Sequence, residues 1–389
     1  MSEATILERL QVANFRNLRD QRLGFEPGIH LVGGANGQGK TNLLDAVHYL
    51  CLTRSHFSYG DAGAIRHGAD FFRVAGRFRS GQRPEHVVVR HRSRKPKVVE
   101  RNGVAYGSLA EHVGLLPAVM ISPSDIELAT GGPEERRRFM DQTISQYDPR
   151  YLRALMTYNR VLKLRNAHLK AAGHPLQIDL TLLAAYDRQL GPVAGEIHGA
   201  REAFATALTP HFESLYAAIG GAAEAPALRY ASRLAERPFG ELLMRSRDQD
   251  AILGRTNVGP HRDDLQLSLG GEPLRRYASQ GQLKTFVLAL RLAQARLLGE
   301  RQSRAPLLLL DDIFDRLDPQ RVQRLVDVVL AEHYAQVFVT DTHEERLRRL
   351  RIDGTPAYYY RVEAGAVRSL TGASDDGAAI EPEGSPQRE

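Results

Sequence analysis

The pattern of apolar and polar positions divides the chain into three stretches, and the first, residues 1–110, is rich in predicted strands. Ile29 to Val32 is an apolar run that enters a glycine-rich turn, and Asp45 to Leu50 continues a helix after that turn. Three further segments have the composition of strands or of a hairpin turn: Arg73 to Phe78, His86 to Arg90, and Asn102-Gly103. This stretch therefore begins with the elements of an α/β sheet domain.

The second stretch, residues 111–245, is predicted to be helical, and the third, residues 246–371, returns to α/β character. The helical prediction depends on apolar side chains at helical spacing, which are Tyr151, Leu155, Tyr158, Leu162 and Leu169. The third stretch contains a strand at Leu265 to Leu269, a helix after Gly281, and apolar runs at Leu307 to Leu310 and Val337 to Val339. The order predicts one sheet domain that carries an inserted helical lobe.

Composition and charge narrow the class of protein. The 389 residues are 42% apolar, enough for a large core and for two domains. The net charge of +6 favours an anionic partner, and the single cysteine, Cys51, excludes an intramolecular disulfide. The N-terminus lacks the apolar core of a signal peptide, and no stretch approaches the roughly 20 apolar residues of a membrane span. We therefore expect a cytoplasmic protein without a membrane partner, whose acidic tail, residues 372–389, is disordered.

A phosphate-binding loop is indicated between the first apolar strand and the helix after it. Residues 34–41 match G-x-x-x-x-G-K-[ST] at every fixed position, and this pattern directs backbone N–H groups toward phosphate oxygens. Lys40 is expected to reach the β- and γ-phosphates of ATP, and the Thr41 hydroxyl to bind Mg²⁺. The candidate nucleotide contacts are Gly34, Asn36, Gly37, Gly39, Lys40, Thr41 and Asn42. The alternative is a glycine turn with an incidental lysine.

Two aspartates follow the apolar run Leu307 to Leu310, as in a buried parallel strand that ends at the ligand-binding edge of a sheet. We expect Asp311 to hold Mg²⁺ and Asp312 to face the water that attacks the γ-phosphate, with Lys40 as the third catalytic candidate. The alternative is a pair of solvated aspartates that cap the next helix. Because aspartate is one methylene shorter than the glutamate of many related ATPases, slow hydrolysis is expected.

A second anion site is predicted at Ser279, Gly281 and Gln282. Ser279 is a natural N-cap, and Gly281 lets a phosphate approach the start of a helix whose apolar stripe includes Leu283 and Phe286. Two helix N-termini shaped for phosphate in one chain suggest that each completes the other across a homodimer interface. An ordinary capped helix is the alternative.

These motifs, in this order, resemble the ATP-binding-cassette heads of chromosome-maintenance and repair ATPases, and the shorter segments resemble the RecF family. The similarity extends from about residue 8 to residue 345. It is carried by Asn14-Phe15-Arg16-Asn17, Thr41 to Ala46, Ser122 to Asp125, Arg136 to Asp141, Arg165-Asn166, Gly259 to Asp264 and Ser279 to Gln282. The resemblance implies an α/β fold: an ABC-type P-loop ATPase head with an antiparallel β-subdomain and an inserted helical lobe.

The resemblance also implies a function. Arg16 is expected to reach the nucleotide phosphates, and an ATP-dependent homodimer to bind duplex DNA and gapped single-strand/double-strand junctions. The resemblance implies RecR and RecO as partners, and a role in RecA loading and the SOS response. It also implies a weak, DNA-stimulated ATPase activity that is used as a switch.

The family pattern is not matched everywhere. Three positions depart from it, with Asp45 for glutamate, Lys284 for arginine and Phe57 for arginine. Which of Asp341, Thr342 and His343 senses the γ-phosphate stays open.

The basic residues are concentrated in the helical stretch. Residues 136–170 contain nine Lys or Arg against two Asp. At 100° per residue one band of a continuous helix collects Arg150, Arg153, Arg160, Lys163 and Lys170. Such a band can neutralise DNA phosphates, although a solvated helix face is equally compatible with the spacing. The resemblance favours DNA. The other classes considered are the cytosolic ATPase subunit of an ABC transporter and a nuclease or translocating motor.

Overall fold

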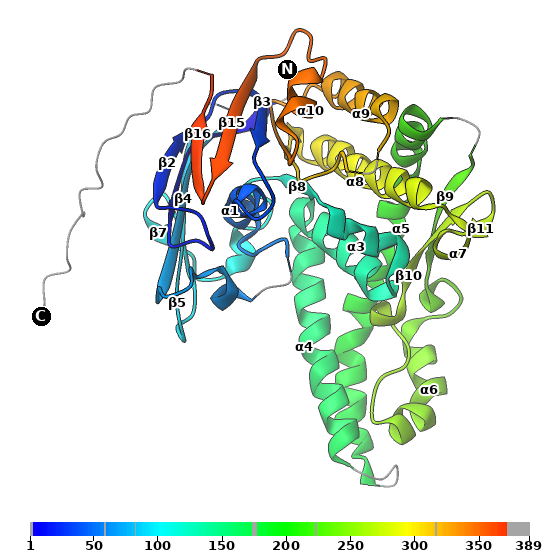
Figure 1. The fold of residues 1–389 in the computed structure, drawn as a ribbon. Coiled ribbons are helices and arrows are strands. Elements are labelled where there is room, and N and C mark those ends of the chain that lie inside the picture. The colour runs from blue at the N-terminus through cyan, green and yellow to red at the C-terminus, as the bar shows by residue number, and fades with distance from the viewer. Residues whose placement is uncertain are drawn as a thin grey trace, which may run out of the picture.

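A computed structural model describes residues 3–57, 60–81, 83–172, 177–221, 224–315 and 317–371. At its centre is a six-stranded sheet in the order β16-β15-β3-β14-β13-β8, in which all but β16 run parallel (Figure 1). Its strands are β3 (Gly28–Gly33), β8 (Ala118–Ile121), β13 (Leu307–Leu310), β14 (Gln336–Asp341), β15 (Ala357–Glu363) and β16 (Ala366–Ser369). The four strands β3, β8, β13 and β14 are buried along their whole length, which accounts for their apolar composition.

A second, mainly antiparallel sheet packs on one side of helix α1 (Lys40–Leu52), and the central sheet packs on the other. It consists of β1 (Glu3–Ala13), β2 (Gln21–Gly24), β4 (Phe71–Ser80), β5 (Arg83–Arg92), β6 (Val98–Arg101), β7 (Val104–Ala105) and the short β12 (Arg304–Ala305). Leu43 and Val47 of α1 share one apolar core with Leu10 of β1 and Phe338 of β14. The first helix is therefore held between two sheets, which fixes the loop before it.

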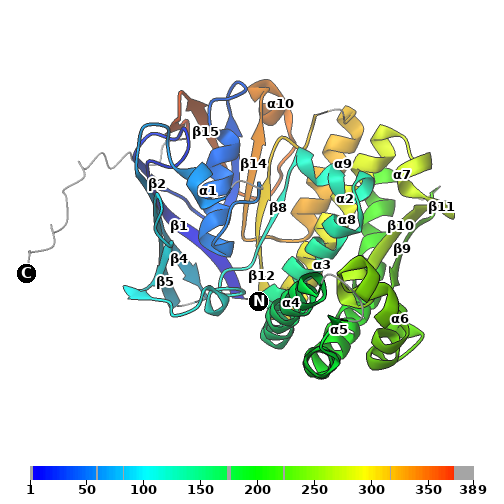
Figure 2. The ribbon, with the colours of Figure 1, turned by 90° about the horizontal axis from the view of Figure 1, so that it is seen from below.

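Helices cover the opposite face of the central sheet and extend from it as a lobe (Figures 1 and 2). Against the sheet lie α8 (Gln280–Gln302) and α9 (Pro319–Ala331), with α10 (Glu344–Arg349) beside β14 and β3. The lobe is built from α2 (Glu127–Thr130), α3 (Pro133–Tyr147), α4 (Pro149–Ala171), α5 (Leu180–Gly220) and α6 (Phe239–Leu253). A three-stranded sheet, β9 (Pro226–Ala231), β10 (Asp264–Leu269) and β11 (Glu272–Pro273), and α7 (Leu274–Tyr277) complete it.

Most expected elements are confirmed, including the hairpin turn, where Asn102 and Gly103 both adopt positive φ between β6 and β7. The helical reading of residues 111–245 is wrong at two strands. β8 pairs in parallel with β13 inside the central sheet, and β9 pairs with β10 across the expected boundary at residue 245. Local composition does not reveal such long-range pairing. We therefore propose that the lobe extends from about residue 123 to residue 278.

The expectation of a disordered tail at residues 372–389 falls outside the described residues. Within the residues that the structure does describe, none of the helices combines the length and the apolar character that a bilayer crossing requires.

Candidate nucleotide site and nucleic-acid surface

The phosphate loop closes around its own lysine. Between β3 and α1, Gly34, Gly37 and Gly39 have φ values of 155°, 76° and 119°, a backbone conformation that favours glycine. Lys40 is buried, and its Nζ donates to the carbonyl oxygens of Gly34 at 2.7 Å and Ala35 at 3.1 Å. The lysine ammonium is thus held within the loop, at the point where the sequence motif places nucleotide phosphates.

Thr41 and Asp311 meet at the edge of the central sheet. The Thr41 hydroxyl donates to both carboxylate oxygens of Asp311, at 3.0 and 2.9 Å. Two oxygens about 3 Å apart occupy adjacent corners of an octahedron with the roughly 2.1 Å metal–oxygen distance of Mg²⁺. The residues present therefore fit the metal that the sequence implies.

Thr340, which the sequence analysis did not select, holds Asp311 from the neighbouring strand β14. Its hydroxyl donates to Asp311 Oδ1 at 2.8 Å and accepts from the Asp312 backbone N–H at 2.9 Å. Burial raises the pKa of Asp311, and the hydroxyls of Thr340 and Thr41 oppose that shift by donating to the carboxylate. The signal that could have found Thr340 is its position at the end of the apolar run in β14, next to β13 in the sheet.

Asp312 lies beside this pair in a strained backbone conformation. Its φ is 48°, in the left-handed region that aspartate visits at some cost. Burial raises the pKa of Asp312, the charge of Lys40 opposes the shift, and the charge of Asp341 adds to it. The structure thus places Asp312 in the electrostatic field of the phosphate-loop lysine.

Arg16 lies against α1 and not inside the loop. Its guanidinium forms an ion pair with Asp45 at 2.8 Å and donates to Asn42 Oδ1 at 3.3 Å and Ser55 Oγ at 2.9 Å. Burial raises the pKa of Asp45, and Arg16 is the first influence that opposes the shift. Phe57, at a position where arginine is usual in the family, packs under the guanidinium, 5.8 Å from ring centroid to Cζ. Two of the three departures from the family pattern, Asp45 and Phe57, therefore meet at Arg16.

The second predicted anion site, residues 279–282, begins α8 and is called the signature segment. Ser279 is exposed, and Gly281 and Gln282 are half-buried. Ser279 Oγ accepts from the Gln282 backbone N–H at 3.2 Å, and Gln282 Oε1 accepts from the Ser279 N–H at 2.7 Å. This reciprocal pair is a capping box, so the predicted N-cap is confirmed. Gln282 also donates to Glu224 at 2.8 Å. Gly281 has only Arg321 near the place where a Cβ would lie.

One copy of the chain does not bring the signature to the phosphate loop. In the described residues, no hydrogen bond or ion pair joins Ser279, Gly281 or Gln282 to residues 34–42. Helix α7, which ends just before Ser279, lies on the opposite side of the molecule from α1 in both views (Figures 1 and 2). The two candidate phosphate sites are therefore separate within a single chain.

The segment 340–343 joins β14 to α10. The Asp341 carboxylate accepts from the His343 backbone N–H at 2.7 Å and pairs with Arg346 at 3.1 Å, so it is committed to the turn before α10. The His343 side chain is 69% exposed and its Nδ1 lies 3.0 Å from the Thr342 hydroxyl. Of the three open candidates, only Asp341 is buried.

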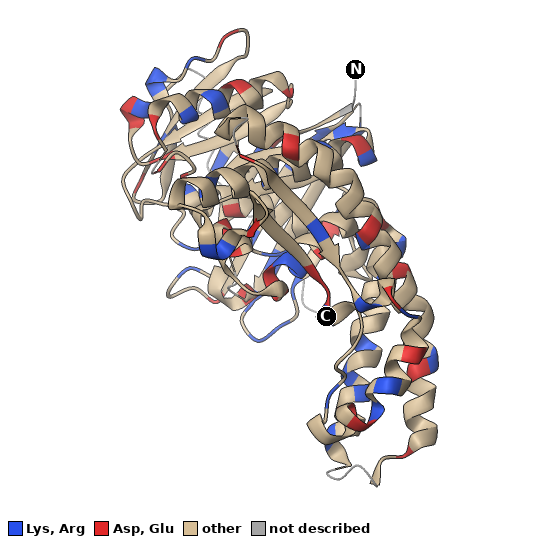
Figure 3. Ribbon diagram, turned by 90° about the vertical axis from the view of Figure 1, so that its right-hand side faces the viewer, with Lys and Arg blue, Asp and Glu red and all other residues tan. Residues whose placement is uncertain are grey.

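The basic surface of the helical lobe is smaller than the sequence count suggests. The expected band, Arg150, Arg153, Arg160, Lys163 and Lys170, is exposed on α4, and basic and acidic segments alternate along the lobe in Figure 3. Arg165, however, is fully buried, and Arg136 forms an ion pair with Asp264 at 2.7 Å. These two arginines hold the lobe together and do not add to the exposed band.

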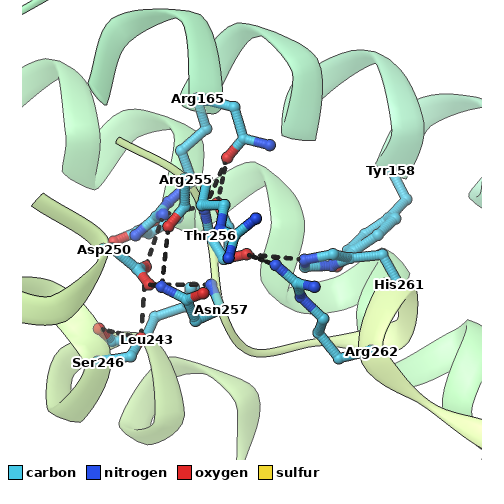
Figure 4. A network of polar contacts seen from close by, with 12 residues as sticks. Tyr158, Arg165, Leu243, Ser246, Asp250, Arg255, Thr256, Asn257, His261 and Arg262 are labelled. Carbon is cyan, nitrogen blue, oxygen red and sulfur yellow. Dashed lines mark hydrogen bonds and ion pairs between the residues drawn. The ribbon is translucent and has the colours of Figure 1, made fainter. Parts of the chain in front are cut away.

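Arg165 is the centre of a polar network beneath that band (Figure 4). Its Nη1 donates to Asp250 at 2.9 Å and to Thr256 at 2.8 Å. The Thr256 carbonyl lies 3.0 Å from His261 Nε2, whose other ring nitrogen lies 2.7 Å from the Tyr158 hydroxyl. Burial lowers the pKa of His261 to about 4, so the ring is neutral near pH 7. The segment Gly259 to Asp264 is thereby fixed to α4.

Comparisons with known proteins agree with this architecture. A family profile described as RecF/RecN/SMC N terminal domain matches residues 6–354. The DNA replication and repair protein RecF of Porphyromonas gingivalis is 41% identical over 93% of this chain and 99% of its own, and that of Parabacteroides distasonis 40% over 94% and 99%.

Among solved structures, one described as the recombination mediator protein RecF-ATP in the RecFOR pathway has a TM-score of 0.86. It is 29% identical over 95% of this chain and 99% of its own. A Smc head domain from Pyrococcus furiosus, at 17% identity and a TM-score of 0.56, shares the fold. The expected α/β head of the ABC type with an inserted helical lobe is confirmed, and this chain belongs to the RecF family.

Proposed function

We propose that this chain is an ATP-dependent DNA-binding clamp of recombinational DNA repair and replication restart. The observation that carries the proposal is the Thr41–Asp311 pair beside a phosphate loop, combined with a signature segment on the far side of the same chain whose Ser279 is exposed. The similar RecF structure described with ATP supports ATP as the nucleotide. The near full-length similarity to RecF argues against the transporter ATPase subunit.

Each residue of the nucleotide site would contact a different part of the bound ATP, its metal or the attacking water. Lys40 would exchange the carbonyls of Gly34 and Ala35 for phosphate oxygens, while the backbone N–H groups from Asn36 to Asn42 hold the rest of the phosphate chain. Thr41 and Asp311 would hold Mg²⁺, which neutralises phosphate charge. Asp312 would orient the attacking water.

Two further side chains complete this proposal. Arg16, which already donates to Asn42 of the phosphate-loop helix, would leave Asp45 for a phosphate. His343 would sense the γ-phosphate, because its imidazole is exposed whereas Asp341 is committed to Arg346.

A second copy of the chain would supply the other half of the site. Ser279, Gly281 and Gln282 offer the N-terminus of a 23-residue helix, whose N–H groups favour an anion. ATP then stabilises the homodimer through contacts that one chain cannot make, and hydrolysis, which we expect to be slow, removes them. The nucleotide thus acts as a switch on dimerisation.

Closure of the dimer would bring two helical lobes around DNA. The exposed band on α4 contacts phosphates and not base edges, so we expect binding that depends on salt and not on sequence. By family membership we extend the proposal to gapped DNA, to action with RecR and RecO in RecA loading and the SOS response, and to the cytoplasm. The RecFOR pathway named for the similar structure supports this part.

Sedimentation of the wild type and of Ser279→Arg, with ATP, Mg²⁺ and duplex DNA at low and moderate salt, tests the clamp. Arginine at this exposed position fills the approach to the helix N-terminus, so the variant should bind ATP and stay monomeric. Ser93→Arg, at an exposed turn after β5, is the matched control and should dimerise as the wild type does. A wild type that remains monomeric with ATP and DNA, or a Ser279→Arg variant that dimerises normally, would refute the shared site.

A further inference from the structure

Arginines face each other across the outer surface of the antiparallel sheet. Arg9 of β1 lies directly opposite Arg77 of β4, which lies opposite His86 of β5. Four residues away on β4, on the same face, Arg73 lies opposite Arg90. Like charges at directly opposed positions destabilise a sheet, so this arrangement lowers stability unless anions lie near it.

Carboxylates of the protein compensate only part of this charge. Five arginines of the face, Arg9, Arg77, Arg79, Arg90 and Arg92, have three carboxylates near them, which are Glu8, Asp70 and Glu100. The Glu8 carboxylate lies 2.8 Å from the Arg79 guanidinium but 3.7 Å from that of Arg77, so its contact with Arg77 is the weaker one. Within the described residues, neither the Arg9 guanidinium nor the His86 imidazole has a hydrogen bond or an ion pair.

The same face is hollowed between these side chains. A cavity of about 560 Å³ is lined by Arg9, Gln11, Ala75, Arg77 and His86, together with Pro84, Glu85 and Asn102. The Glu85 carboxylate is buried and accepts two hydrogen bonds from the Arg101 guanidinium, which compensates its charge. Ala75 pairs with Gln11 on one side and Val88 on the other, so a small side chain lies at the middle of three strands where larger ones would fill the space. Arg9, Arg77 and His86 therefore offer donors to a recess that suits a phosphate group.

An exposed aromatic ring lies at the end of the arginine rows. Phe71, 38% exposed, is on the same face of β4 as Arg73 and lies opposite Arg92. A cationic path that ends at an exposed ring is the arrangement by which proteins bind single strands, with the backbone on the charges and a base on the ring. In Figure 1 this sheet lies at the left, whereas α4 runs downward from the middle of the molecule, so the face and the band proposed for duplex DNA belong to different elements.

We propose that the outer face of β1, β4 and β5 binds the backbone of single-stranded DNA, with a phosphate in the hollow between Arg9, Arg77 and His86 and a base against Phe71. The inference rests on the proposed function, to which it adds the contact for the single-stranded part of gapped DNA. Because every base has a π-face, binding is independent of sequence.

Fluorescence anisotropy of the full chain with a poly-dT oligonucleotide, over a series of salt concentrations, tests the face. For Arg9→Gln with Arg77→Gln, we expect affinity to fall about tenfold or more at low salt. The log–log salt slope should become shallower by about 1.4, or about 0.7 for each lost phosphate contact. Phe71→Ala should lose about fivefold or more with an unchanged salt slope. The matched control, Arg237→Gln with Arg349→Gln, removes two exposed arginines, one just before α6 and one at the end of α10, and should bind as the wild type does.

A parallel titration with blunt duplex DNA separates the two hypotheses. The sheet variants should keep wild-type duplex affinity, whereas Arg160→Gln with Lys163→Gln on α4 should lose it. Unchanged poly-dT affinity and salt slope in the Arg9/Arg77 variant would overturn the single-strand site, whatever the duplex result. Normal duplex binding by the α4 variant would instead count against the proposed function.

Discussion

Helices α1 and α8 both begin with a glycine-containing segment that offers backbone N–H groups. The two N-termini differ in how far the rest of the fold buries and bonds them. At α1, the glycine loop encloses the buried Lys40, and Thr41 is bonded to Asp311 of the neighbouring strand. At α8, Ser279 is exposed, and its hydrogen bonds to the described part of the chain all lie within the first turn of the helix. Gly281 has open space apart from Arg321. One half of the candidate site is completed by folding, and the other is left at the surface.

The basic side chains of the helical lobe also differ in whether the fold buries and bonds them. Arg165 is fully buried and bonded to Asp187, Asp250 and Thr256, whereas Lys163, two residues earlier on α4, is exposed. A side chain whose partners come from the fold contributes to stability, and one left at the surface is available to another molecule. Four pairs of variants test this distinction.

Replacing the buried arginine should have the largest effect on stability. Arg165→Met leaves Asp250 buried without its cation and should lower the free energy of unfolding by about 3–5 kcal/mol. Lys163→Met should change it by less than about 0.5 kcal/mol but reduce the salt slope of duplex binding by about 0.9. Urea denaturation and a salt titration measure the two quantities. Equal destabilisation by both variants would contradict the assignment of a structural role to Arg165 and of a binding role to Lys163.

Asp311→Asn should break the buried half of the nucleotide site without unfolding it. The amide preserves the shape but weakens Mg²⁺ binding, so ATP hydrolysis should fall on the order of 100-fold or more. Phosphate release measures the rate, and Asp353→Asn, at an exposed aspartate, serves as control. Hydrolysis at the wild-type rate would exclude Asp311 as the metal ligand.

Glycine-to-alanine changes in the two helix starts should have opposite effects on stability. Gly39 has a φ of 119° and an added Cβ would lie 2.9 Å from Asn17 Oδ1, so Gly39→Ala should cost about 1–3 kcal/mol. Gly281 is already helical, so Gly281→Ala should gain up to about 1 kcal/mol while weakening ATP-dependent dimerisation. Thermal unfolding and sedimentation give the two readouts. Gly281→Ala that dimerises normally would show that no phosphate approaches this turn.

The smallest expected change in stability is at Ser279, where two variants distinguish helix capping from phosphate binding. Ser279→Ala removes the cap and should cost about 1 kcal/mol, whereas Ser279→Asp keeps a capping oxygen and should leave stability unchanged. The added negative charge of Ser279→Asp should nevertheless abolish dimerisation with ATP. If Ser279→Asp dimerises with ATP, the segment is an ordinary helix cap.

Several features followed from the sequence because they depend on contiguous residues. The phosphate loop, the apolar strand before it, the cap at Ser279 and the Asn102-Gly103 hairpin each involve a few neighbouring positions. Their conformations are determined by local backbone and side-chain chemistry, which the residue order specifies directly. The resemblance of these segments to the RecF family extended the prediction to the whole fold.

Only the tertiary structure decided which distant residues meet. β8 belongs to the central sheet although it lies in a helical stretch, Thr340 holds Asp311 from an adjacent strand, and Arg165 turns inward among exposed cations. The opposition of Arg9 and Arg77 likewise depends on strand register. Pairing, register and burial arise from packing between segments far apart in the chain, and the hydrophobic free energy of that packing is shared by the whole core and not encoded at any one position.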